Sequence, residues 1–307
     1  MIFAITGGTG FVGEALADRL VHKGHEVKVL TRNPSYEREG ITSFVGDLVH
    51  ESSELNSFVQ DVDVLFHCCG ELNDTTKMRS LHVDGTKKLI LAATGNVGRW
   101  VQLSSVGVYG RCRSGLITEE FLESPMGEYE QTKAMSDHLV ESSEIPSTIL
   151  RPSIVFGHRM PNQSLLQLIR AISSKRFFYI GKHDAILNYV HIDDVVNALM
   201  LCGADERAIG NTYISSQSVY LQQLVQTTLD CQQLQQTFRR ISEPLARIFA
   251  SLLGWTKNFP LTTGRVDALT GRCIYDSSKI QGELKFEFGR SLEEQLQSFV
   301  IKKQKLE

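Results

Sequence analysis

The glycine-rich segment TGGTGFVG, residues 6–13, constrains the fold of this chain more than any other feature. It follows the apolar segment IFAIT (2–6), a predicted strand, and it opens a segment with the apolar periodicity of a helix. Glycines at Gly7, Gly10 and Gly13 allow a sharp turn, close approach of a pyrophosphate, and tight packing of helix on strand. The first helical residues, Phe11 and Val12, then present free N–H groups to phosphates. The segment therefore predicts a dinucleotide-binding site.

Short apolar strands alternate with amphipathic helices through the first 150 residues. Such alternation indicates right-handed crossovers and a parallel sheet with helices on both faces. We therefore expect an α/β, doubly wound, Rossmann-type domain over residues 1–155. Its strands are expected at 2–6, 26–30, 42–46, 62–67, 99–104 and 147–151.

The regular alternation of predicted strands and helices becomes weaker after residue 155. Residues 156–307 are expected to form mainly a smaller, mixed substrate-binding lobe, with some segments returning to the main domain. Helices are predicted at 164–173, 193–203, 219–229, 243–254 and 291–304. The apolar stripe of the fourth of these, within 245–253, is predicted to pack or to form a lid in preference to touching a membrane surface.

The end of the second strand indicates which dinucleotide binds. An acidic residue there binds the ribose of NAD, whereas an arginine accepts the 2′-phosphate of NADP. The sequence has Thr31 and Arg32, which favours NADP; in the alternative, Arg32 stacks on adenine and either cofactor binds. Asp47, in the segment GDL with Leu48, is positioned to accept from the adenine amino group or to cap a turn.

Composition excludes several classes of protein. The net charge of −3 gives no electrostatic reason to expect nucleic-acid binding. No apolar run approaches the roughly 20 residues that span a bilayer, and the chain starts directly on a strand, so a cytoplasmic location is expected. The six cysteines include no C-x-x-C pair, which predicts reduced thiols and no metal site.

Two further segments carry residues suited to proton transfer. LSSVGVYG (103–110) follows the fifth strand, and YEQTK (129–133) places a tyrosine and a lysine four residues apart, on one face of a helix. The ordered set TGGTGFVG, GDL, FHCCG, VDGT, LSSVGVYG, YEQTK, LRPSIVFG and YVHIDDVV resembles the extended short-chain dehydrogenase/reductase family, also called the NAD-dependent epimerase/dehydratase family. The resemblance covers residues 1–200, and 275–296 is similar to the end of the family's chains.

The resemblance implies a catalytic group of three residues. Tyr129 would exchange a proton with the substrate oxygen, and Ser105 would hydrogen-bond that oxygen, with Ser104 as the alternative. Lys133 would favour the phenolate by lowering the pKa of Tyr129, and would also hold the nicotinamide ribose. The cofactor contacts implied in addition are Cys68, Pro152 and Ile154.

The chain departs from the family pattern at two places. His82, in HVDGT, replaces the usual asparagine, and a structural contact is favoured over a proton relay. The strand end HCCG keeps small side chains, so it should be tolerated. His67 and His191 are also assigned to structure. Asp193 is expected to cap a helix, and Asp194 to support packing between the lobes.

Three functions stay open. The first is an oxidoreductase or epimerase acting on a nucleotide- or lipid-linked sugar. It is favoured because five polar residues of the lobe could bind hydroxyls and phosphates: Asn162, Gln163, Asn188, Arg265 and Arg272. The second is a reductase of a hydrophobic ketone, similar to dihydroflavonol reductases and 3β-hydroxysteroid dehydrogenases. The third is a non-catalytic NAD(P) sensor or assembly subunit. A small-molecule substrate is the expected partner, and a homodimer stays open.

Overall fold

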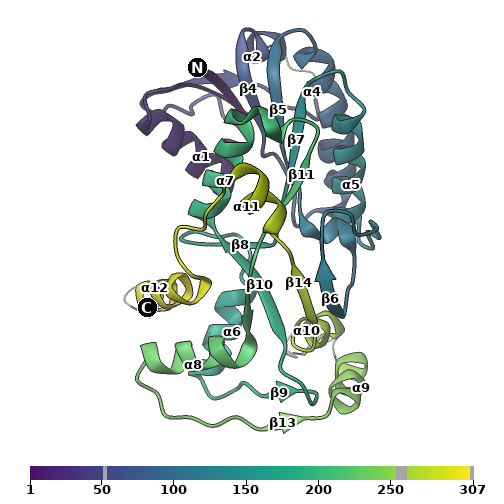
Figure 1. Ribbon diagram of the computed structural model, residues 1–307, viewed down its shortest axis with the longest axis vertical. Helices are drawn as coiled ribbons and strands as arrows, with labels where there is room; N and C mark the ends of the chain where they lie inside the picture. Colours follow the sequence, from purple (N-terminus) through teal and green to yellow (C-terminus); the bar gives the residue numbers. More distant parts are fainter. Residues whose placement is uncertain (51–53, 254–260, 305–307) are drawn as a thin grey trace.

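A seven-stranded parallel sheet forms the centre of the computed structural model, which describes residues 1–50, 54–253 and 261–304 (Figure 1). The strand order is β11-β7-β5-β4-β1-β2-β3. All six predicted strands are confirmed, and a seventh comes from beyond residue 155. The bounds are β1 Ile2–Thr6, β2 Glu26–Thr31, β3 Ile41–Val45, β4 Val62–His67, β5 Val97–Leu103, β7 Ser147–Pro152 and β11 Thr212–Ser215.

Helices cover both faces of this sheet, because its strands are apolar on both sides. In β4, Val64 and Phe66 point to one core and Leu65 to the other. The first core is closed by α1 (Phe11–His22), α7 (Ile192–Ala204) and α11 (Ser278–Leu284). The second core is closed by α2 (Leu55–Val59), α4 (Thr86–Ala93) and α5 (Glu128–Glu141). The chain reverses its direction of growth between β1 and β4, which is where doubly wound sheets bind ligands.

A smaller lobe lies at the carboxyl ends of the main strands (Figure 1). One part packs α6 (Ser164–Ser173), α8 (Leu221–Cys231) and α12 (Leu292–Gln304) against a three-stranded sheet. That sheet consists of β8 (Ile154–Phe156), β10 (Ile186–His191) and β12 (Gln217–Tyr220). The remaining elements are two parallel pairs and two helices: β6 (Ser114–Ile117) with β14 (Arg272–Tyr275), β9 (Tyr179–Ile180) with β13 (Arg240–Ile241), α9 (Glu243–Leu253) and α10 (Thr263–Ala268).

The predicted lobe helices are confirmed to within two residues, and position 254 lies outside the described residues. The division at residue 155 stays a proposal, since β11 shows only that the chain returns to the main sheet. Of the two roles predicted for the apolar stripe of α9, packing is wrong for Leu245, Ile248 and Phe249, which are 51%, 52% and 48% exposed, and the lid stays a prediction. The apolar residues of α9 that pack against the lobe, among those with described side chains, are the small Ala246 and Ala250. Within the described ranges, no helix is long and apolar enough to cross a membrane.

Candidate active site

The glycine turn between β1 and α1 has the shape that a pyrophosphate requires. Gly7 has a φ of +70°, and a Cβ there would lie 2.8 Å from the carbonyl oxygen of Cys68. A Cβ on Gly13 would lie 2.2 Å from the carbonyl oxygen of Gly7. Gly10 precedes α1 and offers no side-chain cap, so the first N–H groups of the helix are left for a ligand. These residues fit the phosphates of a dinucleotide.

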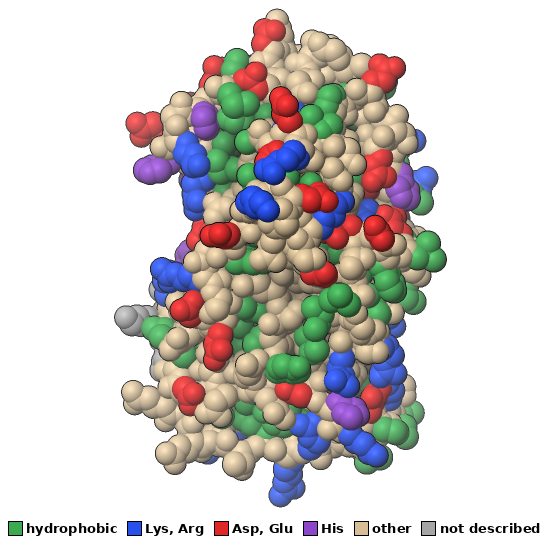
Figure 2. Space-filling model, viewed as in Figure 1, with side chains coloured by type: hydrophobic (Ala, Val, Ile, Leu, Met, Phe, Trp, Pro, Cys, Tyr) green, Lys and Arg blue, Asp and Glu red, His purple; other side chains and the backbone are tan. Residues whose placement is uncertain are grey.

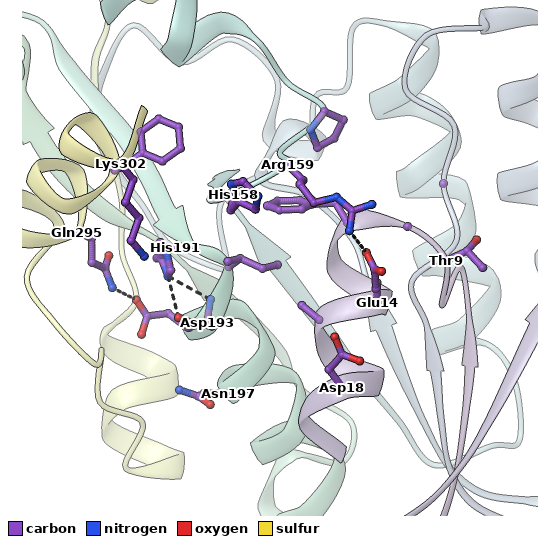
Figure 3. A pocket seen from close by; sticks show the side chains of 18 of the residues that line it. Thr9, Glu14, Asp18, His158, Arg159, His191, Asp193, Asn197, Gln295 and Lys302 are labelled. Carbon is purple, nitrogen blue, oxygen red and sulfur yellow. Dashed lines mark hydrogen bonds and ion pairs between the residues drawn. The ribbon is translucent and has the colours of Figure 1, made fainter. Parts of the chain in front are cut away.

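A cavity of about 940 Å³ opens beside this turn (Figure 3). It is lined by Thr9, Gly10 and Phe11, and it runs between the loop at 70–73 and residues 158–161. From there it continues over α1 and α7 to α12, where Figure 3 shows Lys302 and Gln295 beside His191 and Asp193. Ser105, Tyr129 and Lys133 do not line it. The cavity therefore belongs to the phosphate end of the site.

Ser105 and Tyr129 meet at the end of β5. Ser105 precedes the short 3₁₀-helix Val106–Tyr109, and its hydroxyl accepts a hydrogen bond from the Gly107 N–H at 3.1 Å. The Ser105 side chain also lies beside Tyr129, in the first turn of α5, where it opposes the rise in the pKa of Tyr129 that burial causes. Ser104 is buried and donates to Asp137 at 2.6 Å, so its hydroxyl is already used. The geometry favours Ser105 over Ser104 as the group that faces a substrate.

Lys133 lies one turn beyond Tyr129 and is only 4% exposed. Its Nζ donates to the Leu103 carbonyl, and burial lowers the pKa of the ammonium group. Burial, together with the nearby carboxylates of Asp137 and Glu130, raises the pKa of Tyr129 to about 12. In the protein alone, Lys133 does not produce the expected lowering of the tyrosine pKa, because desolvation and two negative charges dominate.

Beneath these residues lies a buried ion-pair network that the sequence analysis missed. Asp137 is fully buried, and its Oδ2 accepts hydrogen bonds from Ser104 and, at 3.1 Å, from Arg151 Nη2. Arg151, which is 3% exposed, also donates to the Tyr109 hydroxyl at 3.1 Å and pairs with Glu123. Burial raises the pKa of Asp137, while Arg151 and Lys133 lower it. The spacing 129, 133, 137 on one helix face was the available signal.

His82 connects the helix of Tyr129 to the loop that lines the cavity. It lies in a π-helix, Ser80–Gly85, and its ring packs edge-on against Tyr129 with centroids 5.8 Å apart. Its Nε2 accepts from the Glu71 N–H at 2.8 Å, so its Nδ1 carries the proton and donates to Thr132 Oγ1 at 2.8 Å. Thr132 in turn donates to main-chain carbonyls, which cannot pass a proton on. The predicted structural role of His82 is confirmed.

His67 has a similar structural role deeper in the sheet. Its ring nitrogens bond Thr6 Oγ1 at 2.6 Å and Thr86 Oγ1 at 3.1 Å, as its assignment to structure predicted. Burial holds the pKa of His67 well below its usual value, and burial together with Lys133 lowers the pKa of His82 to about 3. Both histidines are therefore neutral in the folded protein at neutral pH.

These two histidines predict a loss of stability in mild acid. The contribution of these histidines to the unfolding free energy is complete above about pH 6.5, the ordinary pKa of an unfolded histidine. It declines as the pH falls toward 3, because in this range only the unfolded chain takes up the protons. The unfolding free energy should fall by up to about 1.4 kcal/mol per pH unit for each histidine. Denaturant titrations at pH 7.5 and 5.5 measure this difference. The His82→Asn variant should take up one proton fewer on unfolding, so its unfolding free energy should fall less between pH 7.5 and 5.5. An equal fall in the variant and the parent would contradict the assignment of His82 as a neutral histidine.

The remaining predicted cofactor residues lie at the carboxyl edge of the sheet. Arg32 is exposed after β2, whereas Leu48 is buried. The Asp47 carboxylate accepts from the Val49 N–H at 2.9 Å, as the turn-capping alternative requires. Pro152 ends β7, and Ile154, 40% exposed, begins β8. Their contacts with a cofactor stay predictions.

Two expectations at α7 have different outcomes. The prediction that Asp193 caps the helix is wrong. The cap is His191, whose Nδ1 accepts from the Asp193 N–H, because the helix begins one residue earlier than expected. The packing role of Asp194 is confirmed. Its buried carboxylate accepts from the Gly289 N–H at 2.8 Å and from Gln295 Nε2 at 2.6 Å.

The fold and the turn together define a Rossmann-type dinucleotide-binding protein with a Tyr-x-x-x-Lys helix at the sheet edge. Comparison with known families is consistent with that class, since the NAD dependent epimerase/dehydratase family matches residues 3–214. The chain belongs to this family.

Curated relatives differ in what they act on. A sterol-4-alpha-carboxylate 3-dehydrogenase of Mus musculus is 23% identical over 209 residues, which are 64% of this chain and 58% of the relative. A farnesylated dihydroquinoline-oxide ketoreductase of Stigmatella aurantiaca is 28% identical, over 67% of this chain and 65% of the relative. A dTDP-6-deoxy-L-talose 4-dehydrogenase of Kitasatospora kifunensis is 29% identical, over 67% of this chain and 70% of the relative. The chain thus matches less than two thirds of the length of the first two.

Solved structures share the whole architecture. MoeE5, solved with UDP-glucuronic acid and NAD, covers 100% of both chains with a TM-score of 0.78 at 21% identity. The UDP-glucose 4-epimerase of Thermotoga maritima covers 100% of both chains with a TM-score of 0.77 at 18% identity. These similarities establish the fold, including the part of the lobe that follows residue 214, where the family match ends.

Proposed function

We propose that this protein is an NAD(P)-dependent oxidoreductase or epimerase that transfers a hydride at a carbon bearing a carbonyl or hydroxyl group. The observation that carries the proposal is the position of Ser105 beside Tyr129, with Lys133 one helical turn away. A non-catalytic sensor would have no need for these three groups together.

Each residue has a separate task in this mechanism. The Ser105 hydroxyl orients the substrate oxygen, and the Tyr129 hydroxyl exchanges a proton with that oxygen. Lys133 is fixed by the Leu103 carbonyl, and with the cofactor bound its positive charge would favour the ionised tyrosine, which burial and two carboxylates disfavour in the protein alone. The nicotinamide, when bound, supplies or accepts the hydride, and its oxidised form adds positive charge. The pKa of about 12 keeps Tyr129 protonated in the protein alone, and the protonated form is the one that donates in the reducing direction.

For the substrate we favour a sugar linked to a nucleoside diphosphate. An arginine cluster lies around β6 and β14: among the described residues, Arg111, Arg113 and Arg247 share two carboxylates, Glu243 and Asp267. Arg272 adjoins the cluster, since its N–H donates to the Arg113 carbonyl. The excess positive charge of the cluster suits a diphosphate. The cluster is also connected to the catalytic group, since β6 follows the loop that carries Ser105. The Kitasatospora relative, named for a dTDP-sugar, agrees with this choice.

Two residues that motivated the sugar prediction no longer support it. The Asn188 amide donates to the Cys273 carbonyl and accepts from the Ser218 hydroxyl. Asn162 accepts from the Ser164 N–H at the start of α6. Both side chains are used in the structure of the lobe, so the sugar proposal rests on the arginines.

The second candidate is a hydrophobic ketone. The mouse and Stigmatella relatives are named for lipophilic substrates, and the stripe of α9 exposes apolar side chains on the lobe.

Thermal unfolding separates the two candidate substrates, since a ligand that binds only the folded state raises the melting temperature. UDP or TDP at millimolar concentration, added with NADPH, should stabilise the parent, and Arg113→Gln/Arg272→Gln should lose that shift while keeping the shift from NADPH. Stabilisation by a hydrophobic ketone alone would reverse our preference.

The cofactor preference gives a separate prediction. NADPH should bind about 10- to 150-fold more tightly than NADH, because exposed Arg32 can pair with the 2′-phosphate, and a hydrogen bond to a charged group contributes about 1.5–3 kcal/mol. Arg32→Ala should weaken NADPH binding alone and remove the difference, as measured by calorimetric titration. Arg207→Ala provides a control, since Arg207 is exposed, pairs with Asp205 and does not line the cavity beside the glycine turn. Equal affinities in the parent protein would refute the NADP preference.

A further inference from the structure

The outer face of α9 is a continuous apolar stripe. Leu245, Ile248, Phe249 and Leu252 recur at the spacing of one helix face and are 51%, 52%, 48% and 64% exposed. The inner face consists of Ala246 and Ala250, which pack against Ile180, Leu261 and Val266. Large apolar side chains thus point outward on this helix, and small ones point inward. Patches of this kind mark interaction sites.

Basic residues surround the stripe. The tip of the lobe, defined as residues 174–184 and 239–253, contains six Lys or Arg and two Asp or Glu. Its net charge is therefore +4, in a chain whose total is −3. Figure 2 shows basic and apolar side chains next to each other at this end of the molecule.

Most of these charges face solvent and are not neutralised. Lys175, Arg176, Lys182 and Arg239 are exposed, and within the described parts of the chain none of them forms an ion pair. Arg240 donates to the Gly181 and His183 carbonyls and lies over the Tyr179 ring, which accounts for its position without cancelling its charge.

We propose that the tip of the lobe docks on an anionic lipid surface, with α9 lying in the plane of the interface. An apolar face flanked by Lys and Arg is the pattern of interfacial helices, in which buried apolar area and attraction to anionic headgroups both contribute to binding. The helix is 11 residues long, about 16 Å, so it lies on a membrane and does not span one.

A second copy of the chain fits this face less well. A symmetric contact would place one tip of charge +4 against another. A stable dimer interface also buries about 800 Å² on each partner, more than one stripe along a helix of about 16 Å offers. A lipid surface has no such size requirement and carries the complementary charge. The proposal does not depend on the proposed function, because the exposed Lys175, Arg176, Lys182 and Arg239 lie outside the arginine cluster proposed for the substrate.

The test is flotation of the full chain with large unilamellar vesicles, without cofactor or substrate. Vesicles of phosphatidylglycerol and phosphatidylcholine should bind the protein, and pure phosphatidylcholine vesicles should bind it at least tenfold more weakly. Binding should also fall at least tenfold at 0.5 M salt, because screening removes the electrostatic part. Lys182→Glu/Arg239→Glu should lose more than tenfold, since each basic residue near the surface contributes roughly fivefold.

The apolar contribution is tested with Ile248→Ser/Phe249→Ser, which should lose at least tenfold in vesicle binding with an unchanged melting temperature. The matched control is Leu91→Ser/Leu122→Ser, which changes two residues that are 79% and 82% exposed on the main domain and should bind like the parent. Absence of binding to anionic vesicles, or equal losses in both double variants, would overturn the proposal. A change confined to the sedimentation coefficient of the free protein would also overturn it and would assign the stripe to self-association.

Discussion

Tyr129→Phe is expected to lower turnover by about 10²–10⁴-fold while the affinity for the dinucleotide changes little. The substitution removes only the hydroxyl that exchanges a proton with the substrate. The hydroxyl lies beside Ser105 and not at the glycine turn, so its loss should leave the turn and its contacts unchanged. Steady-state rates with the carbonyl substrate, together with calorimetric titration of the cofactor, measure the two effects separately.

Tyr220→Phe is the matched control, since it makes the same chemical change at a tyrosine of the lobe that is 51% exposed. Its turnover should equal that of the parent. A Tyr129→Phe variant that retained turnover within a few-fold of the parent would remove Tyr129 from the chemistry. A parallel loss of cofactor binding would instead assign Tyr129 to the cofactor site.

Asp137→Ala is expected to lower the free energy of unfolding by about 3–5 kcal/mol, because the buried Arg151 loses the fully buried one of its two carboxylate partners. Arg151 is 3% exposed, and the remaining carboxylate partner, Glu123, lies at the edge of the network. Urea denaturation monitored by circular dichroism measures the change. Asp193→Ala is the control, since the Asp193 carboxylate is 60% exposed and pairs with Arg19 at 3.4 Å, so it should cost less than about 1 kcal/mol.

A double variant distinguishes the ion pair from general packing. Asp137→Leu/Arg151→Met removes both charges together and should be closer to the parent in stability than either single variant. If the losses of unfolding free energy in the two single variants add up to the loss in the double variant, Asp137 and Arg151 contribute independently. A loss below about 1 kcal/mol for Asp137→Ala would show that the interior tolerates Arg151 without this carboxylate.

Local features of the sequence determined the main fold. The turn at 6–13 was predictable because glycine is needed where the backbone of Gly7 adopts a φ of +70° and where Gly13 approaches the Gly7 carbonyl oxygen at a distance that excludes a Cβ. The six strands were predictable because strands buried on both faces are apolar along their whole length. Tyr129 and Lys133 were found because a spacing of four residues fixes their shared helix face.

The tertiary structure decided what depends on partners distant in the sequence. Asp137 and Arg151 pair between α5 and β7, and this pairing explains a buried carboxylate that composition alone would place on the surface. The pKa of Tyr129 was misjudged because helical spacing shows its distance from Lys133 but not its burial or the charges of Asp137 and Glu130. The stripe of α9 was expected to be buried because periodicity shows that one face is apolar, whereas only the position of Ala246 and Ala250 against the lobe shows which face is covered. Spacing and composition are properties of the chain itself, whereas burial and charge pairing arise only when distant segments are brought into contact.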